Sequence, residues 1–315
     1  MGRSVMATTT RNNLAWAGAL LALLVGVYFR NPAYALLLGL ATRLLTGINP
    51  LHRVANWGKL SLQTAIVLLG FTLGFDRLMQ VSADYGVVVA IFVLGTLALG
   101  FAMAKILASE TNEATLLSGG TAICGGTAIA TLAPIIQAKP QHVGVAMALV
   151  FLFNAVALLT FPYIGHALDL SQQDFGAWVA LAIHDTSSVV ATAAIYGDEA
   201  AVVATTVKLG RTLWLIPLAF AVSLIYRSSE ARLRVPGFIL LFIAAAVLGS
   251  FIPMNDALLG GISVLSKALL VVALGMIGLE IDRATLSQIS WRSIALGMGL
   301  WILVAPAALL LVLWL

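Results

Sequence analysis

Long apolar runs, separated by short polar stretches, make up most of the chain. Their approximate limits are residues 14–29, 33–45, 60–75, 85–107, 114–138, 143–164, 175–196, 200–226, 237–252, 264–278 and 294–315. The runs are continuous and do not alternate between apolar and polar positions, as the strands of a membrane barrel would. A helix of about 20 such residues crosses the hydrocarbon core of a bilayer, so the pattern predicts an all-α, polytopic membrane protein of about 11 transmembrane helices.

The composition agrees with a lipid-embedded chain. Of the 315 residues, 61% are hydrophobic and only 10% are charged, which is too little charge to cover a water-soluble domain. No long linker separates two units, so we expect a single transmembrane domain over residues 1–315. The one cysteine excludes an internal disulfide and the four histidines are scattered, so neither a metal site nor a cofactor is expected. No dense basic patch accompanies the net charge of +4, so we expect no nucleic-acid partner.

The distribution of Lys and Arg predicts an orientation. If successive segments alternate in direction, one side of the membrane receives Arg3, Arg11, Arg53, Lys59, Lys105, Arg227, Arg232, Arg234, Arg283 and Arg292. The other side receives Arg30, Arg77, Lys139 and Lys267. Since cytoplasmic loops are richer in basic residues, we expect the N-terminus in the cytoplasm and the C-terminus outside. The first apolar run also fits a signal peptide, but apolar chain continues directly after it, which favours a first transmembrane helix.

Two parts of the chain resemble each other. The stretches NPAYALLLGLATRLLTGINP and VPGFILLFIAAAVLGSFIP are apolar runs of similar length flanked by prolines, and the helix after each carries Lys, then Gly eleven residues later (Lys59 and Gly70, Lys267 and Gly278). The two stretches lie an odd number of segments apart, and an odd shift reverses orientation in the bilayer. Inverted repeats are typical of secondary transporters. We therefore predict that residues 31–107 and 235–315 are related by an inverted repeat around a core of residues 113–226; chance similarity between Leu-rich helices is the alternative.

The segment at residues 114–138 contains two glycine pairs, and each glycine lowers helix stability by about 0.5–1 kcal/mol relative to alanine. Non-helical chain at membrane depth persists only beside protein or an aqueous cavity, so the pairs predict a broken helix whose free N–H groups attract an anion. The alternative is close helix packing through small residues. The candidate substrate-binding residues of this segment are Ser118, Gly119, Gly120, Thr121, Cys124, Gly125, Gly126 and Thr127.

Ionisable side chains also occur in the middle of the segment at residues 175–196. His184 and Asp185 lie about ten residues inside it, where ionisable groups are rare and commonly functional. Such a pair can hold and release a proton, so we expect it to couple transport to an ion. We expect one continuous helix here, on which Ser187 and Ser188 share faces with this pair, and both are substrate-binding candidates. The alternative is a helix end close to the membrane surface.

Two cations stand three residues apart in the segment at residues 200–226. Lys208 and Arg211 repel each other unless a negative group joins them, and Asp185 neutralises only one. The unbalanced positive charge is what an anionic substrate would complete, so Lys208 and Arg211 are both substrate-binding candidates. The alternative is that both side chains extend to the membrane interface. Asn154, in the segment at residues 143–164, is an uncharged candidate, for which a hydrogen bond between helices is the alternative.

Three stretches of the chain resemble the YeiH-type family of bacterial inner-membrane proteins, described as sulfate exporters. They are GGTAICGGTAIAT, GAWVALAIHDTSSVVATAAIYG and VKLGRTLWLIPLAF, in that order. The family's Ser-Ile-Cys-Gly-Ala-Ser-Ala-Ile signature corresponds to residues 122–129, with Gly126 where Ala is frequent, and some members have Glu at the place of Asp185. The resemblance implies a fold similar to bile-acid and sodium–proton antiporter-type carriers, with inverted repeats, a panel, and a core of crossed discontinuous helices.

Together these features predict a secondary active transporter of a small anion, either sulfate or a related oxyanion or sulfonate. The expected partners are that anion, a coupling proton or sodium ion and the lipid bilayer; a homodimer is left open. One alternative is a sodium-coupled carrier or cation/proton exchanger, in which Asp185 and nearby hydroxyl groups bind Na⁺. Another is an intramembrane enzyme using Cys124, His184 and Asp185. Since no nucleophile turn accompanies Cys124, we expect no enzymatic activity.

Overall fold

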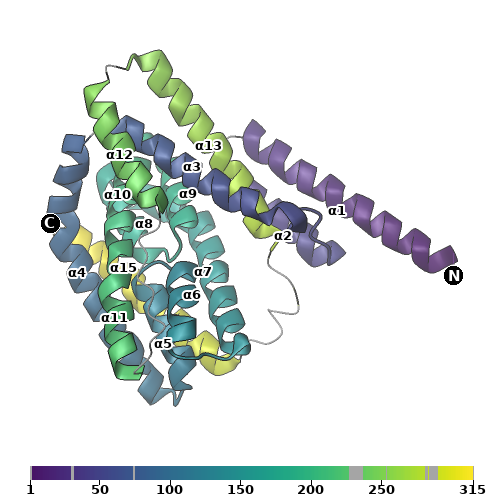
Figure 1. The fold of residues 1–315 in the computed structure, drawn as a ribbon, viewed down its shortest axis with the longest axis horizontal. Coiled ribbons are helices and arrows are strands. Elements are labelled where there is room, and N and C mark those ends of the chain that lie inside the picture. Colours follow the sequence, from purple (N-terminus) through teal and green to yellow (C-terminus); the bar gives the residue numbers. More distant parts are fainter. Residues whose placement is uncertain are drawn as a thin grey trace.

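The computed structural model describes residues 2–29, 32–73, 75–226, 237–252, 254–280, 283 and 290–314, and these residues form helices and short connections without a strand (Figure 1). The helices are α1 (Gly2–Tyr28), α2 (Pro32–Thr46), the 3-10 turn η1 (His52–Val54), α3 (Ala55–Leu73), α4 (Phe75–Ile106), α5 (Thr111–Ala122), α6 (Gly126–Ile135), α7 (Pro140–Ala167), α8 (Gln172–Ala182), α9 (Thr186–Tyr196), α10 (Asp198–Leu213), α11 (Leu215–Tyr226), α12 (Gly237–Phe251), α13 (Asp256–Gly278) and α15 (Trp291–Leu313). The predicted all-α fold is confirmed.

Every predicted apolar run falls on one helix or on two consecutive helices. Five helical segments are by themselves long and apolar enough to cross a membrane: Phe75–Ile106, Gln141–Ala167, Asp198–Tyr226, Ala257–Gly278 and Trp291–Leu313. The chain is therefore a multi-pass membrane protein. Of the basic residues that predict its orientation, Arg30, Arg227, Arg232 and Arg234 lie outside the described residues.

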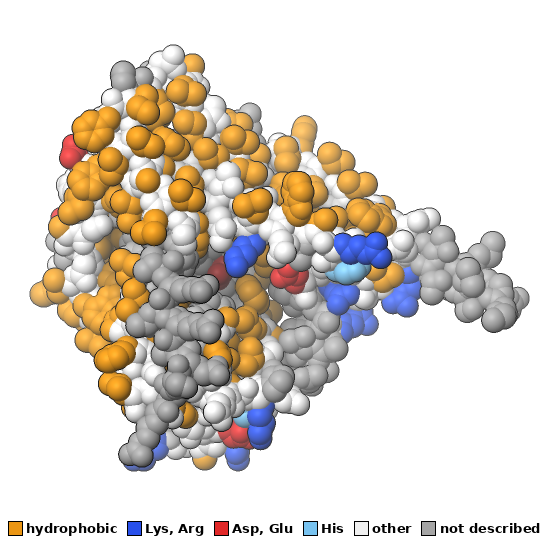
Figure 2. All heavy atoms as spheres, viewed as in Figure 1, with side chains coloured by type: hydrophobic (Ala, Val, Ile, Leu, Met, Phe, Trp, Pro, Cys, Tyr) orange, Lys and Arg blue, Asp and Glu red, His pale blue; other side chains and the backbone are white. Residues whose placement is uncertain are grey.

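Side chains on the outside of the helices are mainly apolar. Figure 2 shows hydrophobic atoms spread over most of the described part of one face, with charged groups confined to a few places. Leu24, Val87 and Leu310 are examples, each more than two thirds exposed. Such a surface is unstable in water but is matched by the acyl chains of a bilayer.

The helices pack as two units. One, which we call the scaffold, consists of α1, α2, α3, α12 and α13; the other, the core, consists of α4 to α11 and α15 (Figure 1). Within the scaffold, α13 packs against α2 and α3, and α3 packs against α12 and α13. Contacts between the two units are sparser: α12 contacts α4, α13 contacts α9, α3 contacts α10, and α2 contacts α7 and α9. This division separates a packed core from a layer of helices beside it.

Two core segments are interrupted helices. α5 and α6 have 12 and 10 residues, and α8 and α9 have 11 each, so no half alone reaches the length of about 20 residues that a bilayer requires. The break predicted between residues 114 and 138 is confirmed, but it occurs only at the second glycine pair, since Gly119 and Gly120 are within α5. The prediction of a continuous helix through His184 and Asp185 is wrong, because α8 ends at Ala182.

Candidate functional site

The break between α5 and α6 depends on Gly125. Its φ of 58° lies in the region that favours glycine, and its amide donates to the Gly120 carbonyl at 2.8 Å. A Cβ at this position would lie 2.9 Å from Val150 Cγ1 and 3.2 Å from His184 Cβ, closer than side chains normally approach. The chain therefore turns at Gly125, and α6 begins at Gly126 with no side chain capping its first amides.

The break between α8 and α9 contains neither glycine nor proline. Ile183 has an extended backbone, and Asp185 is the N-cap of α9, where its carboxylate accepts a hydrogen bond from the Ser187 amide at 3.0 Å. The Ser187 hydroxyl donates to the same carboxylate oxygen. An aspartate at this position satisfies amides that have no partner inside the helix. Asp185 thus stabilises the start of α9.

The two breaks lie against each other. The place of a Cβ on Gly125 is 3.3 Å from the Asp185 amide nitrogen, so the α5–α6 turn rests on the α8–α9 turn. Asn154 of α7 binds the second turn, since its side-chain oxygen accepts from the His184 amide at 3.1 Å and lies 3.2 Å from His184 Nδ1. We call this meeting place of the two breaks the crossing. It brings together residues separated by about sixty positions in the sequence.

Lys208 reaches the crossing from α10. Its ammonium group is fully buried and donates to the carbonyl of Ile123 at 3.1 Å and to that of Ile183 at 2.7 Å. These carbonyls belong to the residues that directly follow α5 and α8. One cation therefore binds the C-terminal ends of both leading half-helices.

Arg211 binds the same two helix ends. Its guanidinium is fully buried and donates to five carbonyls, those of Thr121, Ala122, Ala180, Leu181 and Ile183. Its carbon Cζ lies 4.8 Å from the centre of the Phe92 ring. The C-terminal end of a helix carries a partial negative charge, roughly half an elementary charge, so both cations are neutralised in part by backbone. Neither extends to the membrane interface, the alternative raised by the sequence.

The remaining predicted site residues differ in their burial and in the helix on which they lie. Gly126 and Thr127 form the first turn of α6, where Gly126 is half-buried and Thr127 is exposed. Cys124 lies in the α5–α6 break and is 1% exposed. The other candidates lie on α5 or in the first turn of α9, and all are buried: Ser118, Gly119, Gly120, Thr121, Ser187 and Ser188. The hydroxyl of Ser118 lies against Gly100 of α4.

Two buried polar atoms at the crossing have no partner within the described residues. They are Asn154 Nδ2 and His184 Nε2, on side chains that are each 1% exposed. Because His184 Nδ1 faces the Asn154 oxygen, it carries the ring proton, and Nε2 is a free acceptor. Buried polar groups are nearly always hydrogen-bonded, so an unpaired donor and an unpaired acceptor on two contacting side chains indicate a place for water or a ligand.

Sequence reasoning missed two groups that complete the site. Trp301 of α15 donates from its indole nitrogen to the Ala182 carbonyl at 3.0 Å, and Phe92 of α4 lies under Arg211. No local pattern identifies either, because each is an aromatic residue in an apolar helix. The second break had a detectable signal: Asp185, followed by Thr-Ser-Ser, is a favourable N-cap sequence.

Comparison with known proteins places the chain in a family. The model of the family described as conserved hypothetical protein 698 matches residues 8–297. The chain belongs to this family, which is the YeiH family of UPF0324 membrane proteins. The resemblance noted in the sequence is thus confirmed.

Named relatives of the UPF0324 family match most of the chain. The UPF0324 membrane protein of Vibrio parahaemolyticus is 42% identical over 262 residues, which are 81% of this chain and 84% of the relative. That of Geobacter sulfurreducens is 40% identical over 278 residues, 88% and 89% of the two chains. That of Porphyromonas gingivalis is 42% identical over 288 residues, 90% and 87%. No solved structure matches the chain.

Proposed function

We propose that this UPF0324 protein is a secondary active transporter of a small anion, sulfate or a related oxyanion or sulfonate. The observation that carries the proposal is the charge at the crossing. Lys208 and Arg211 bring two positive charges, and among the described residues there Asp185 brings one negative charge. The partial charges of the two helix C-termini and the two helix N-termini cancel. A surplus of one positive charge in a buried place favours binding of an anion.

The groups best placed to contact that anion are not the two cations, since carbonyls engage two donors of Lys208 and most of those of Arg211. The N-cap of α6 is Gly125, which has no side chain to cap the amides of Gly126 and Thr127, whereas Asp185 caps the first turn of α9. Free amides at a helix N-terminus bind anions readily, and the surplus charge strengthens the attraction. We place the anion at the start of α6, at Gly126 and Thr127, with the unpaired amide of Asn154 as a further donor.

Asp185 is the residue to which we assign ion coupling. It is half-buried beside the crossing, and loss of its negative charge on protonation would alter the local charge by one unit. His184 assists as a neutral acceptor. Sodium coupling is the second candidate, since the Asp185 carboxylate and the Ser187 hydroxyl are adjacent oxygen groups of the kind that bind Na⁺.

The Cys-dependent enzyme is the weakest candidate. Cys124 is buried in the α5–α6 break, and the described hydrogen bonds join His184 Nδ1 to Asn154, not to Asp185. His184 Nε2, the atom that would take the Cys124 proton, has no hydrogen-bond partner among the described residues, so nucleophile and base are not paired. We therefore retain the proposal that the protein is not an enzyme.

The wider architecture supports a carrier. We propose about eleven spans in the bacterial inner membrane, with the N-terminus in the cytoplasm. The packing of the scaffold is reciprocal: a Cβ on Gly70 of α3 would lie 2.6 Å from the Phe242 carbonyl of α12, and Gly278 of α13 faces the Leu36 carbonyl of α2. Matched glycines that each receive the short helix of the other copy are what an inverted repeat would produce. A homodimer stays open.

Flux through proteoliposomes tests the function. When a pH gradient is imposed, we expect vesicles with wild-type protein to take up radiolabelled sulfate faster than protein-free vesicles. We expect Asp185→Asn to reduce that uptake rate at least about tenfold. Asp84→Asn, which changes an exposed carboxylate of α4, is the matched control and should keep the rate. Uptake driven by a sodium gradient alone would identify Na⁺, and not the proton, as the coupling ion. If folded wild-type protein moves neither sulfate nor other oxyanions and sulfonates, the proposal is wrong.

A further inference from the structure

A cleft lies between the scaffold and the core. Two cavities of about 610 Å³ and 400 Å³ share Asp198, Gly260 and Ser263 in their linings, so they adjoin each other, and we call them together the cleft. Gly260 and Ser263 belong to α13 of the scaffold, and Asp198 is the first residue of α10 in the core. The cleft therefore separates the two units at the start of α10.

An ion pair spans this cleft. Lys267 Nζ of α13 lies 2.6 Å from Asp198 Oδ1 of α10, and the two side chains are 32% and 71% exposed. The contact joins the scaffold directly to the core. An exposed ion pair contributes little to stability because water screens it, so it can separate at low cost. This combination of a direct link and a low cost of opening suits a gate.

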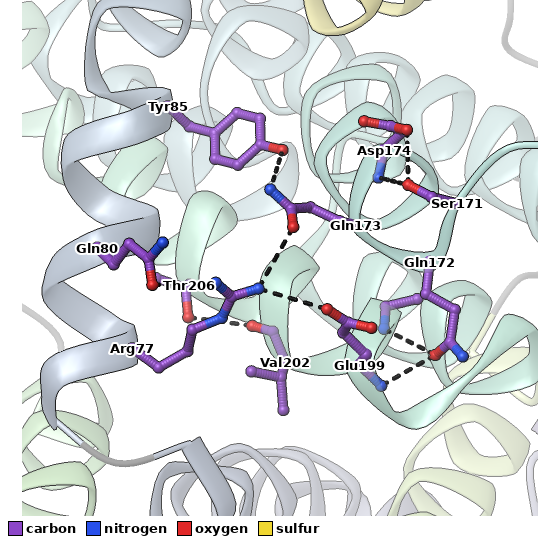
Figure 3. A network of polar contacts seen from close by, with 11 residues as sticks. Arg77, Gln80, Tyr85, Ser171, Gln172, Gln173, Asp174, Glu199, Val202 and Thr206 are labelled. Carbon is purple, nitrogen blue, oxygen red and sulfur yellow. Dashed lines mark hydrogen bonds and ion pairs between the residues drawn. The ribbon is translucent and has the colours of Figure 1, made fainter. Parts of the chain in front are cut away.

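The core side of the cleft is braced separately (Figure 3). Arg77 of α4 donates to Glu199 of α10 at 3.3 Å and to Gln173 of α8 at 3.4 Å. The side-chain oxygen of Gln172 accepts from the amides of Glu199 and Ala200. These contacts connect α4, α8 and the first turn of α10 within the core. When the core moves, Asp198 must move with it and away from Lys267.

The same helix connects the cleft to the crossing. Asp198 and Lys208 lie ten residues apart on α10, which is about 15 Å along a helix. We propose that the cleft is the access route for the anion and that the Lys267–Asp198 ion pair is its gate, an inference that rests on the proposed transport function. Opening of the pair frees the Lys267 ammonium group inside the cleft, where it attracts the entering anion.

Cysteine labelling tests the gate without any transported substrate. Ser263→Cys, the parent for labelling, places a thiol in the cleft, and the wild-type protein, whose native Cys124 is 1% exposed, gives the background rate. In reconstituted full-length protein, we expect Lys267→Gln to raise the rate of labelling by a hydrophilic maleimide about three- to fivefold. Arg77→Gln is the matched control, because it breaks an ion pair at the same turn of α10 within the core, and it should leave the rate within about twofold.

Exchanging the charges of Lys267 and Asp198 is the decisive experiment. Lys267→Asp combined with Asp198→Lys restores the pair with reversed signs and should return labelling to the parental rate. Higher salt should speed labelling of the parent and leave Lys267→Gln unchanged, since salt screens only an existing pair. Equal labelling rates in the parent and in Lys267→Gln would overturn the proposed gate, provided that size-exclusion chromatography shows both proteins to be folded. Because no anion is present, that result would leave the transport proposal standing.

Discussion

At the scale of single residues, the most informative feature is the use of buried cations to bind backbone. A helix that stops inside a membrane leaves carbonyls without partners, and each unsatisfied group costs several kcal/mol in hydrocarbon, on the order of 2–7. Lys208 and Arg211 supply the missing donors for α5 and α8 together. The sequence shows both cations but not their partners, because carbonyls are present at every position. The sequence predicts both as substrate-binding residues; from these carbonyl contacts we propose instead that they hold the site open and positively charged.

Arg211→Lys tests this role. Lysine has three donors on one nitrogen and cannot reach five carbonyls on two helices, so we expect a loss of about 2–4 kcal/mol in the free energy of unfolding. Thermal unfolding in detergent measures the change. Arg53→Lys, at an exposed arginine of η1, should stay within about 0.5 kcal/mol of wild type. An unchanged melting temperature in Arg211→Lys would show that the carbonyl contacts are dispensable.

The adjacent glycines of the α5–α6 break should differ sharply. Gly125→Ala places a methyl group in a left-handed conformation against Val150 and His184, and we expect it to cost about 1–2 kcal/mol for the backbone alone and more for the contacts. At Gly126 the nearest side-chain atoms are 3.5 Å away, so Gly126→Ala should fold normally. The melting temperatures of Gly125→Ala and Gly126→Ala in detergent measure this difference. Equal stability of both variants would contradict the geometry of the turn.

At the scale of elements, the sequence predicts what depends on composition and misses what depends on distant contacts. Apolar runs identify the helices, because a helix that crosses the hydrocarbon core of a bilayer needs a continuous run of apolar residues. The break at Gly125 was predicted, since only glycine adopts its backbone conformation freely. The break after Ala182 was not predicted, because its one local signal, the N-cap Asp185, does not show where α8 ends. Contacts of His184 with Asn154 and of Ile183 with Lys208 hold that turn together with the Asp185 cap.

The reciprocal glycines of the scaffold provide a test at this scale. Gly70→Leu and Gly278→Leu both insert a side chain where a helix backbone passes, so each should destabilise by about 2–3 kcal/mol. Gly95→Ala in α4, which has no atom within 4 Å, should be neutral or stabilising. Thermal unfolding of the three variants in detergent measures these changes in stability. A large effect of only one leucine would show that the two halves of the scaffold are not equivalent.

At the scale of the whole molecule, the two units have different tasks. The core holds the crossing, a site built from two broken helices and stabilised from α7, α10 and α15. The scaffold packs through close glycine contacts and meets the core across a cleft with an ion pair. Motion of one unit against the other would expose the crossing alternately to the two sides of the membrane, which is the general basis of secondary transport.

The central claim is that an anion binds at the start of α6. Gly126→Pro removes one amide donor at the first helical position, where proline is tolerated, and Gly126→Ala adds a methyl group but keeps the donor. The measurement is calorimetric titration of purified protein with sulfate. We expect wild type and Gly126→Ala to bind with similar affinity and Gly126→Pro to bind about tenfold more weakly, as the loss of one hydrogen bond to a charged group implies. Equal binding by folded Gly126→Pro and Gly126→Ala, or no binding of sulfate and related anions by wild type, would contradict the account.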